Sequence, residues 1–520
     1  MGRAEFFTRS AKCRIPFAHN GLAGIFPNCT SGRFSGTYGR FTPEFVLGTG
    51  DPRGLAGGLT VGIHGSVAEQ ARLDEGELRV LVENGEYWLR NRGDIAMMVM
   101  TVERLRARWP RARIGVLTHQ PAILRALLPT VEPISGPDWD WPADDLRGRV
   151  TRTAATKLVA PLALRWRAAT DGPKDRVRAA LADRRERADA GPGDTDVFPV
   201  RIPPAAERAS LVLALGGGYL TDVDRYQAHR TLDLLDYAAA QGIPTALLGQ
   251  GIGPLHDSGL LDHARKVLPS VDLVAVRESR RGPGLLTGLG VDPERVIVTG
   301  DDAVEFGYRL RDARIGANLG LCLRVADYAR VSDAARAMLG TVVRRMASEL
   351  DAGIVPLIIS EYASEDRRCT LPLLDGSVRA LPAVGRGGTA RDVARQVADC
   401  RLLVTSAYHL AVFALSQGIP AVGITVSEYY DDKFHGLAQM FGAGLRVVHL
   451  DSAALESELS AAVSAVWDEA PAVRDALQQK ALEQIEASRA TLARVCGLVE
   501  ERAGNKPCGP RNEGPANAAN

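Results

Sequence analysis

The stretch that decides the fold reads VTSAYHLAVFALSQGIPAVGITVSEYYDDK over residues 404–433. Its apolar start is followed by a helical pattern over 408–417 and by a second apolar run over 421–426. Gly418 ends the helix, and Pro420 prevents it from restarting. The pattern therefore predicts a strand, a helix and a second strand, which is the unit of a parallel α/β sheet.

His409 lies at the corner between the predicted first strand and the helix. In open α/β sheets, ligands bind at the carboxyl ends of the strands, where loops meet helix N-termini. This position makes His409 a candidate for catalysis, with a structural histidine in the core as the alternative. Support for either interpretation has to come from the rest of the chain.

The composition of the 520-residue chain is that of an ordinary globular protein, with 46% hydrophobic residues, 24% charged residues and a net charge of +1. Such a balance gives no overall field that would attract nucleic acid or an acidic membrane. The seven scattered cysteines form no CxxC pair, which favours a reducing compartment and argues against structural zinc. No apolar run approaches the roughly 18 to 20 residues that span a bilayer, and the N-terminus lacks a secretory signal pattern. We expect a cytoplasmic protein without a nucleic-acid partner; peripheral contact with a membrane stays open.

The pattern contains two successive α/β units, so we expect two Rossmann-like domains that face each other across a cleft. Residues 1–76 lack periodicity and predict a poorly ordered extension. Residues 77–308 alternate strands and helices around a charged helical excursion at about 138–198. The second domain is expected over 315–500, and a disordered tail over 503–520.

Shorter elements are expected within these domains. Helices over 154–170 and 174–188 fill the charged excursion. In the second domain, residues 378–384 predict a strand, and the C-terminal part predicts two amphipathic helices over 453–467 and 470–500.

Four successive strands of the first domain end in small or polar residues. They end at 216–218, 250–253, 277–279 and 300–302. This is how one edge of a parallel sheet becomes a ligand cleft. The glycines in the first two segments allow backbone N–H groups to approach an anion, with plain tight turns as the alternative.

Two arginines each close an apolar strand and must reach a polar partner, because an arginine charge is almost never buried unpaired. Arg277 is expected to pair with Glu278 or Asp301, or to clamp a carboxylate or phosphate of a ligand. Arg324 ends a predicted strand of the second domain, and we expect it in the same way to pair with an acidic residue or to bind a ligand anion. Asp94 follows a turn and predicts a helix cap, with contact to a substrate as the alternative.

Other kinds of site find little support. The acidic pairs at 301–302 and 431–432 lie in no metal-binding motif, so we expect no metal site. The chain has no G-x-S-x-G elbow for Ser–His–Asp hydrolysis. The dinucleotide fingerprint is also absent, because Tyr219 and Leu220 follow the three glycines.

The chain resembles the polysaccharide pyruvyl transferase family through six motifs in the family's order. They are NRGD (91–94), LGGGYLTD (215–222), GQGIGPL (249–255), VAVRES (274–279), VTGDDA (298–303) and YHLAVFALSQGIPAVGI (408–424). The resemblance covers about residues 78–450 and implies a glycosyltransferase-B-like fold.

The resemblance also implies transfer of a pyruvyl group from phosphoenolpyruvate to a sugar, forming a ketal on a cell-surface polysaccharide or a lipid-linked glycan. This reaction needs a general acid to protonate the enol ether at carbon and a base to take a hydroxyl proton. The donor's carboxylate and phosphate need cations. The family pattern implies His409 as the acid or base, Asp94 beside the acceptor hydroxyl, and Arg277 and Arg324 as the cations. It implies no metal or organic cofactor.

Further residues enter the site through the same resemblance. Residues implied on the donor side are Gly217, Gly218, Gln250, Gly251, Ser406 and Tyr408. Residues implied on the acceptor side are Asn91, Glu278 and Asp301.

One position departs from the family's pattern. Members commonly carry an arginine two residues before the histidine, where this chain has Ala407. A phosphate donor would lose a contact of about 1.5 to 3 kcal/mol, so either another arginine substitutes or the donor or acceptor differs. The departure also favours a ligand-binding relative without catalysis. A further alternative is a glycosyltransferase that uses a nucleotide sugar, because H-x3-FAL-x2-GIP-x-VG over 409–423 also resembles the donor-side motif of that fold.

Overall fold

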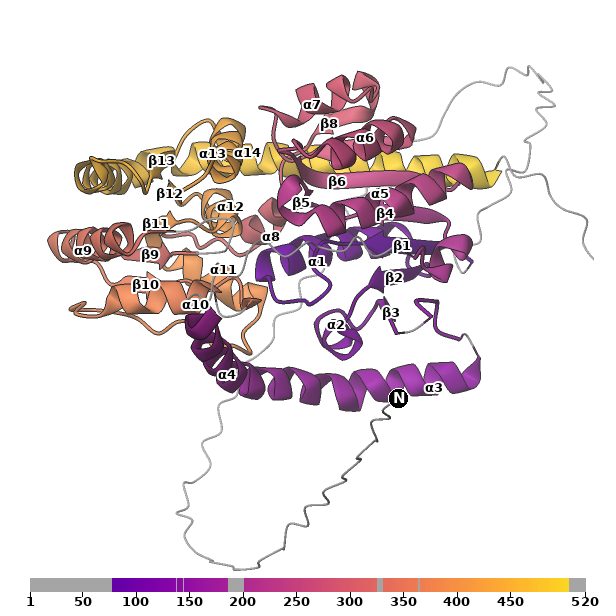
Figure 1. Ribbon diagram of the computed structural model, residues 1–520, viewed down its shortest axis with the longest axis horizontal. Helices are drawn as coiled ribbons and strands as arrows, with labels where there is room; N and C mark the ends of the chain where they lie inside the picture. Colours follow the sequence, from indigo (N-terminus) through magenta and orange to yellow (C-terminus); the bar gives the residue numbers. More distant parts are fainter. Residues whose placement is uncertain are drawn as a thin grey trace, which may run out of the picture. The chain divides into compact units, whose positions relative to one another are not determined.

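Two parallel β-sheets with helices packed against them form the part of the chain that the computed structural model describes (Figure 1). The described residues are 77–136, 138–143, 145–185, 201–324, 331–362 and 365–504. The extension expected over 1–76 and the tail from 505 lie outside them. The fold class expected from the sequence, α/β with two Rossmann-like sheets in a glycosyltransferase-B-like arrangement, is confirmed.

The first sheet has the strand order β3-β2-β1-β4-β6-β7-β8, with β5 paired to β6 and all pairs parallel. The strands are β1 (Arg79–Glu83), β2 (Arg113–Leu117), β3 (Glu132–Ile134), β4 (Leu211–Ala214), β5 (Gly217–Leu220), β6 (Thr245–Ile252), β7 (Leu273–Val276) and β8 (Val296–Val298). The chain first builds outward from β1 to β3 and then in the other direction from β4. This reversal between β1 and β4 opens a crevice at their carboxyl ends, where ligands bind in such sheets.

Helices accompany these strands. They are α1 (Arg92–Arg108), α2 (Pro121–Leu127), α5 (Arg225–Ala240), α6 (Ser258–Val267), α7 (Gly282–Gly288) and α8 (Ala303–Arg309). Short 3-10 turns are η2 (Pro204–Arg208), η3 (Asp222–Asp224), η4 (Leu268–Ser270), η5 (Pro293–Arg295) and, in the second half, η7 (Leu371–Leu374). Strand β4 is buried at every position, as expected for a central parallel strand covered on both faces.

The second sheet is also parallel, with the order β10-β9-β11-β12-β13. Its strands are β9 (Asn318–Cys322), β10 (Ile354–Pro356), β11 (Cys400–Thr405), β12 (Ala421–Thr425) and β13 (Leu445–His449), and its helices are α9 (Asp333–Glu349), α10 (Glu365–Thr370), α11 (Ala390–Ala398), α12 (Tyr408–Gln417) and α13 (Glu428–Phe441). The order reverses between β9 and β11, so a second crevice opens beside the end of β11. The strand–helix–strand unit predicted over 404–426 is confirmed. Gly418 ends α12 in the left-handed conformation at φ 82°.

Two predicted helices at the C-terminus form one helix instead, α14 (Leu455–Gly504), which continues through Pro471. The break expected between 467 and 470 is wrong because the helix has packing partners along its whole length. Leu459 and Val463 pack against the second sheet, Leu477 joins the cluster around α12, and Val495 packs against the first sheet. Figure 1 shows this helix in yellow alongside elements of both sheets.

Two further details differ from the expected pattern. The excursion is helical from α3 (Leu146–Ala154) through the π-turn η1 (Ala155–Val159) to the end of α4 (Ala160–Arg185), without the break expected at 171–173. The strand expected over 378–384 is wrong: only Ala380 forms an isolated bridge, to Ile354.

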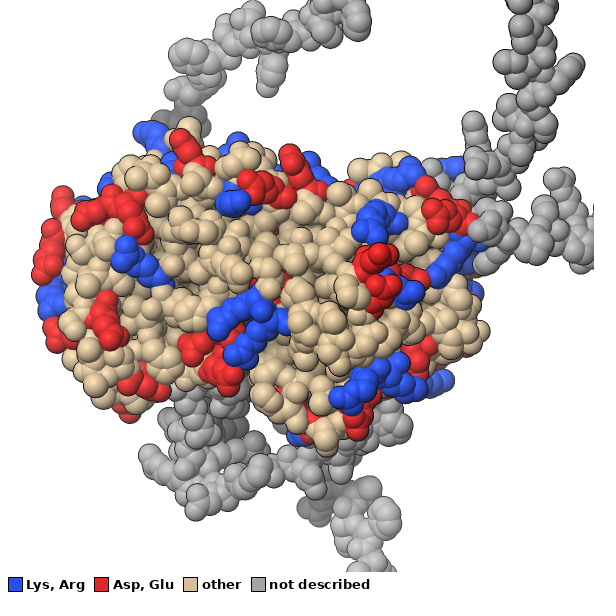
Figure 2. Space-filling model, turned by 90° about the horizontal axis from the view of Figure 1, so that it is seen from above, with Lys and Arg blue, Asp and Glu red and all other residues tan. Residues whose placement is uncertain are grey.

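The surface of the described part carries both signs of charge. Lys and Arg side chains lie interspersed with Asp and Glu over the face drawn in Figure 2. This mixture agrees with the net charge of +1.

Candidate active site

A cavity of about 320 Å³ lies where the carboxyl ends of the two sheets meet. Its lining from the first sheet includes Glu86, Asn91, Asp94, Gly216, Gly217, Gly218 and Arg277, and its lining from the second includes Arg324, Tyr362, Tyr408, His409, Tyr429 and Lys433. Both topological reversals therefore contribute to one site, as the general rule for α/β sheets requires.

His409 and Asp94 face each other in this cavity. The Nε2 atom of His409 lies 3.7 Å from Oδ1 of Asp94 and 3.8 Å from Oδ2 of Asp301. It has no hydrogen-bond partner among the described residues, although it is buried. The ring reaches this place because Gly93 has no side chain: a Cβ atom there would lie 2.2 Å from Cγ of His409. The imidazole thus presents an unoccupied nitrogen to whatever binds in the cavity.

Burial sets the charge of both groups. Burial, with repulsion from Glu86 and Asp301, raises the pKa of Asp94 to about 8. Burial, with the nearby charges of Arg277, Arg324 and Lys433, holds the pKa of His409 well below its usual range. At neutral pH, Asp94 therefore carries a proton and His409 does not, so the pair combines a proton donor with a proton acceptor.

Two cations converge on the backbone at Gly218. A Cβ atom on this glycine would lie 2.9 Å from Nζ of Lys433 and 3.2 Å from Nη2 of Arg277. The ammonium of Lys433 stacks 3.6 Å from the ring centroid of Tyr429, and no carboxylate pairs with it among the described residues. Burial and the charge of Arg277 hold the pKa of Lys433 well below its usual range. An anion bound between them would favour the charged form of Lys433, since a neighbouring opposite charge raises the pKa of an amine, so these two basic side chains form a site for an anion.

Arg277 keeps one carboxylate partner, as the sequence predicted. Its Nη1 lies 3.5 Å from Oδ2 of Asp301, and its guanidinium carbon lies 4.2 Å from the ring centroid of Tyr408. Glu278, the other predicted partner, instead accepts backbone N–H groups from Arg280, Arg281 and Gly282. Glu278 therefore shapes the turn after β7 and lines the neighbouring cavity, outside the His409 site.

Arg324 reaches the cavity while bound on one side. Its Nε and Nη2 atoms donate to the carboxylate of Asp366 at 2.8 and 3.1 Å. Its backbone N–H donates to Oγ of Ser406 at 2.7 Å. Ser406 does not line the cavity. Its effect on the site is therefore to hold the backbone of Arg324 in place.

Several residues expected on the donor or acceptor side have other contacts. Gln250 is fully buried and donates to the hydroxyl of Tyr219 at 2.8 Å. Gly251 lies against the guanidinium of Arg277 and lines the neighbouring cavity. Asn91 caps helix α1 by accepting from the N–H of Gly93, so the cap expected from Asp94 is wrong. Asp94 is left free to face the cavity because Asn91 fills the capping role.

Sequence reasoning missed Lys433, Glu86 and Tyr362. The hydroxyl of Tyr362 donates to Oε1 of Glu86 at 2.6 Å, which joins the two halves of the site. Burial raises the pKa of Glu86. Lys433 lies four residues after Tyr429 on α13, so helical spacing combined with the strand end at 425 could have revealed it.

The described residues contain no group of three or more His, Cys, Asp or Glu side chains that could hold a metal ion. Within the described ranges, no helix combines the length and the apolar character that a membrane crossing requires.

Comparisons with known proteins give one family. The sequence model of the polysaccharide pyruvyl transferase family matches residues 91–428, which is more than half of the chain. A comparison with curated protein sequences found no match.

Solved structures are similar only at low identity. A putative UDP-N-acetylglucosamine 2-epimerase from Listeria monocytogenes is 13% identical, with 82% of this chain and 97% of that chain covered and a TM-score of 0.49. A UDP-GlcNAc 2-epimerase from Neisseria meningitidis is 11% identical, with coverage of 81% and 99% and a TM-score of 0.45. A UDP-glucosyltransferase from Polygonum tinctorium is 12% identical, with coverage of 81% and 98% and a TM-score of 0.45. The match over 91–428, which includes Asp94, Arg277 and His409 of the cavity, shows that the chain belongs to the polysaccharide pyruvyl transferase family.

Proposed function

We propose that this protein transfers a pyruvyl group from phosphoenolpyruvate to a hydroxyl pair of a sugar, releasing inorganic phosphate. The observation that carries the proposal is the facing pair of protonated Asp94 and neutral His409, 3.7 Å apart, beside two converging cations. Membership of the family supports the class of reaction. The acceptor is then a sugar of a cell-surface polysaccharide or a lipid-linked glycan.

The donor's two anionic groups fit the cations of the cavity. Arg277 and Lys433 approach the same backbone at Gly218 from opposite sheets. The guanidinium of Arg277 can bind a carboxylate through two N–H groups, and the ammonium of Lys433 neutralises a phosphate as a point charge. An enol phosphate that carries a carboxylate brings both anions together in one small molecule.

Lys433 also accounts for the departure at Ala407. The side chain of Ala407 is fully buried in the hydrophobic cluster under α12, so position 407 contributes no charge. Lys433 supplies a cation to the same cavity from α13. In this proposal it takes the part that an arginine at position 407 would otherwise play.

The acid and the base have separate roles in the reaction. Asp94 donates its proton to the methylene carbon of the enol, which leaves a cationic centre at the adjoining carbon. A sugar hydroxyl attacks this centre and gives its proton to Nε2 of His409, from which it returns to Asp94. The second hydroxyl then displaces the phosphate, which leaves with the remaining proton, and the ketal closes. Asp94, which the family resemblance implied as a catalytic residue beside the acceptor hydroxyl, is thus the acid.

A second candidate is glycosyl transfer from a nucleotide sugar. A neighbouring cavity of about 360 Å³ shares Arg277, Tyr408, Tyr429 and Lys433 with the His409 site. A donor larger than phosphoenolpyruvate could extend into it past these residues. This cavity is the observation that keeps the second candidate open.

A cytoplasmic location is part of the proposal. Cys322, Cys400 and Cys496 are buried free thiols. Free buried thiols are the state expected in a reducing compartment.

The test is release of phosphate from phosphoenolpyruvate by the purified protein in the presence of sugar acceptors. We expect release with the wild type and a fall of roughly 10²- to 10⁴-fold in kcat for His409→Asn, because a general base is lost. His435→Asn is the matched control, since His435 is exposed and lies outside the cavity. Its activity should equal that of the wild type.

Parallel reactions with nucleotide sugars distinguish the alternatives. Release of nucleoside diphosphate, without release of phosphate from phosphoenolpyruvate, would replace the proposal by glycosyl transfer. Binding of phosphoenolpyruvate without turnover of any acceptor would indicate a relative that has lost catalysis. A large drop in the thermal midpoint of His409→Asn would make His409 a structural residue.

A further inference from the structure

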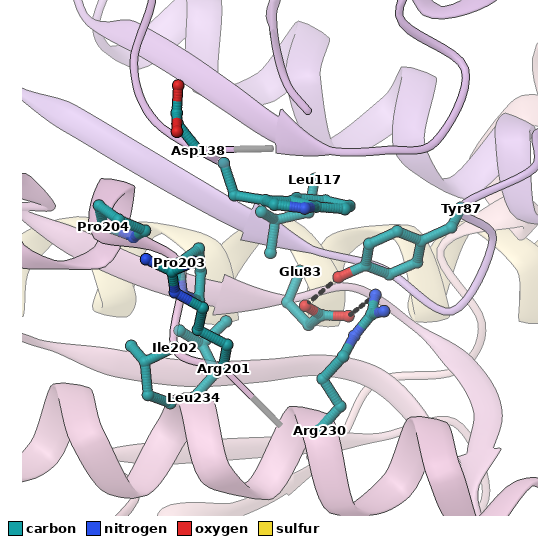
Figure 3. Close-up of a pocket in the computed structure, with 11 residues that line it drawn as sticks. Glu83, Tyr87, Leu117, Asp138, Arg201, Ile202, Pro203, Pro204, Arg230 and Leu234 are labelled. Carbon is teal, nitrogen blue, oxygen red and sulfur yellow. Dashed lines mark hydrogen bonds and ion pairs between the residues drawn. The ribbon is translucent and has the colours of Figure 1, made fainter. Parts of the chain in front are cut away.

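A second cavity of about 190 Å³ lies beside the carboxyl end of β1 (Figure 3). Most of its lining is apolar or aromatic: Tyr87, Leu117, Trp139, Ile202, Pro203, Pro204 and Leu234. The polar side chains are Glu83, Asp138, Arg201 and Arg230. The volume is below the roughly 300–1,000 Å³ of sites for drug-sized ligands, so the cavity suits a single ring.

Arg230 offers hydrogen bonds that no described residue accepts. Its guanidinium carbon lies 3.4 Å from the ring centroid of Tyr87, and Nη2 is 3.9 Å from Oε1 of Glu83. The buried Nε and Nη2 atoms have no hydrogen-bond partner among the described residues. A buried N–H group without an acceptor costs free energy. A ligand oxygen that accepts from Arg230 would remove this cost, so the site favours a ligand with acceptor oxygens over an apolar one.

The carboxylate of Glu83 is already engaged by protein groups. Tyr87 donates its hydroxyl hydrogen to Oε2 at 2.5 Å, and Nε2 of Gln227 donates to Oε1 at 2.6 Å. Figure 3 shows Tyr87 and Arg230 both turned toward this carboxylate. Glu83 therefore fixes the wall of the cavity, while Arg230 is the group with free donors.

Aromatic rings continue from the cavity to the surface. Tyr87 and His119 each pack against Trp139, with ring centroids 5.9 and 5.2 Å apart, and Trp88 packs against His119 at 5.0 Å. Trp88 is 49% exposed. The backbone of Trp139 has φ 44°, a conformation that costs energy for a residue with a side chain and that concentrates at ligand sites.

The cavity adjoins the candidate active site through one short segment. Glu83 and Tyr87 line the second cavity, whereas Gly85 and Glu86, between them in the chain, line the His409 site. Helix α5 gives Arg230 to the second cavity, and its capping residue Asp224 lines the first. The two cavities therefore border the same segment, residues 83–87.

We propose that the cavity of Tyr87, Trp139 and Arg230 is a second carbohydrate subsite, which holds the sugar next to the one modified at Asp94 and His409. The acceptor is then an oligosaccharide and not a free monosaccharide. The inference rests on the proposed function for the role of the neighbouring site. It deepens that function by naming the size of the acceptor.

A sugar fits these walls better than an anion or a lipid. The apolar face of a pyranose packs on aromatic rings, and its hydroxyl oxygens accept from Arg230. A phosphate would have to compete with Glu83 for the guanidinium of Arg230, to which Oε1 of Glu83 already lies at 3.9 Å. An acyl chain would leave the guanidinium donors unpaired in the cavity.

The test measures binding by calorimetry, so that it does not depend on turnover. The probes are glucose, galactose, mannose and N-acetylglucosamine, and the disaccharides cellobiose, lactose, mannobiose and diacetylchitobiose. We expect at least one disaccharide to bind tenfold or more tightly than its monosaccharides. Arg230→Gln should weaken that binding at least tenfold, as expected on losing hydrogen bonds from a charged group.

Controls match the chemistry of each change. Arg311 also stacks on a tyrosine, with its guanidinium carbon 3.8 Å from the ring of Tyr308, and it lies outside the cavity, so Arg311→Gln should bind as the wild type. Trp139→Gly removes the ring while the glycine accepts the backbone at φ 44°, which guards against a folding defect. It should also lose the disaccharide. Trp166→Ala is its control, because that side chain is 71% exposed.

Each outcome decides the proposal. Equal binding of disaccharide by Arg230→Gln, Trp139→Gly and wild type would overturn it, as would a panel in which no disaccharide exceeds its monosaccharides. Uridine competing with the bound disaccharide at this cavity would assign it to a nucleoside instead. If disaccharide binding depends on Arg230 while phosphate release from phosphoenolpyruvate fails, the subsite stands and the proposed reaction falls.

Discussion

Asp94 and His409 are both neutral near pH 7 for the same physical reason: a buried site disfavours whichever form carries charge. For the carboxyl the neutral form is protonated, and for the imidazole it is unprotonated. One environment therefore produces an acid and a base from two residues 3.7 Å apart. The sequence identified both residues as candidates but did not show which of them is protonated at neutral pH.

The raised pKa of Asp94 predicts how the activity depends on pH. Since the acid must be protonated, kcat/KM for pyruvyl transfer should be level up to about pH 8 and fall above it. Rates measured from pH 6 to 10 check this. Activity that rises through pH 8 would instead make ionised Asp94 the working form.

The variant Asp94→Asn tests the raised pKa of Asp94 through the stability of the fold, because asparagine does not titrate. An unfolded aspartate loses its proton near pH 3.9, whereas the folded one keeps it to about pH 8. This group therefore lowers the stability of the wild type progressively as the pH rises from about 4 to 8. The asparagine variant should lack that trend in its thermal midpoint, and its turnover should be severely reduced at every pH.

At the scale of elements, the first turns of α1 and α12 meet at Gly93 and His409. Contact this close is allowed only by a residue without a Cβ atom, since one would lie 2.2 Å from Cγ of the imidazole. Three residues of the NRGD motif thus have different roles. Asn91 caps the helix, Gly93 admits the histidine, and Asp94 faces it.

Gly93→Ala should consequently displace His409 from the cavity. We expect destabilisation of about 1 to 3 kcal/mol from overpacking, together with loss of most activity. Urea unfolding and phosphate release measure the two effects. Gly497→Ala, within α14, is the matched control, because a Cβ atom there meets nothing within 4 Å. It should leave activity unchanged and add up to about 1 kcal/mol of stability; a neutral Gly93→Ala would refute the close contact.

At the scale of the whole described structure, Glu305 joins elements that are far apart in the sequence. This side chain on α8 is 1% exposed and pairs with Arg104 of α1, at 2.5 Å, and with Arg489 of α14. Burial acts to raise the pKa of Glu305, but the hydrogen bonds and charges of Arg489, Arg104 and Arg309 lower it to about 2. The cluster holds together helices that border both sheets.

Glu305→Gln should therefore lower the free energy of unfolding by about 2 kcal/mol at neutral pH. A depressed carboxyl pKa stabilises the fold above the unfolded value near 4.3, and this stabilisation is lost as the pH falls toward 2. The difference between variant and wild type should accordingly shrink in acid. Glu103→Gln is the control: Glu103 is 51% exposed in its pair with Arg309, so its loss should cost less than about 1 kcal/mol.

The sequence by itself determined the local elements and the type of fold. Strand β11, helix α12 and strand β12 follow from apolar periodicity and from Gly418, because these signals act between neighbours in the chain. The six motifs determined the family. The break expected between 467 and 470 does not occur, because packing along the whole of α14 outweighs the local cost of a proline at 471.

Only the tertiary structure decided which residues share the candidate site. Lys433, Tyr362 and Glu86 come from separate parts of the chain, and nothing local in the sequence relates Tyr362 or Glu86 to His409. Glu278 and Gln250 look equally functional in the sequence, yet Glu278 accepts backbone N–H groups of a turn and the amide nitrogen of Gln250 donates to Tyr219 in the core. Charge states, too, depend on burial and on neighbours across the cavity, which arise only when two sheets bring their carboxyl ends together.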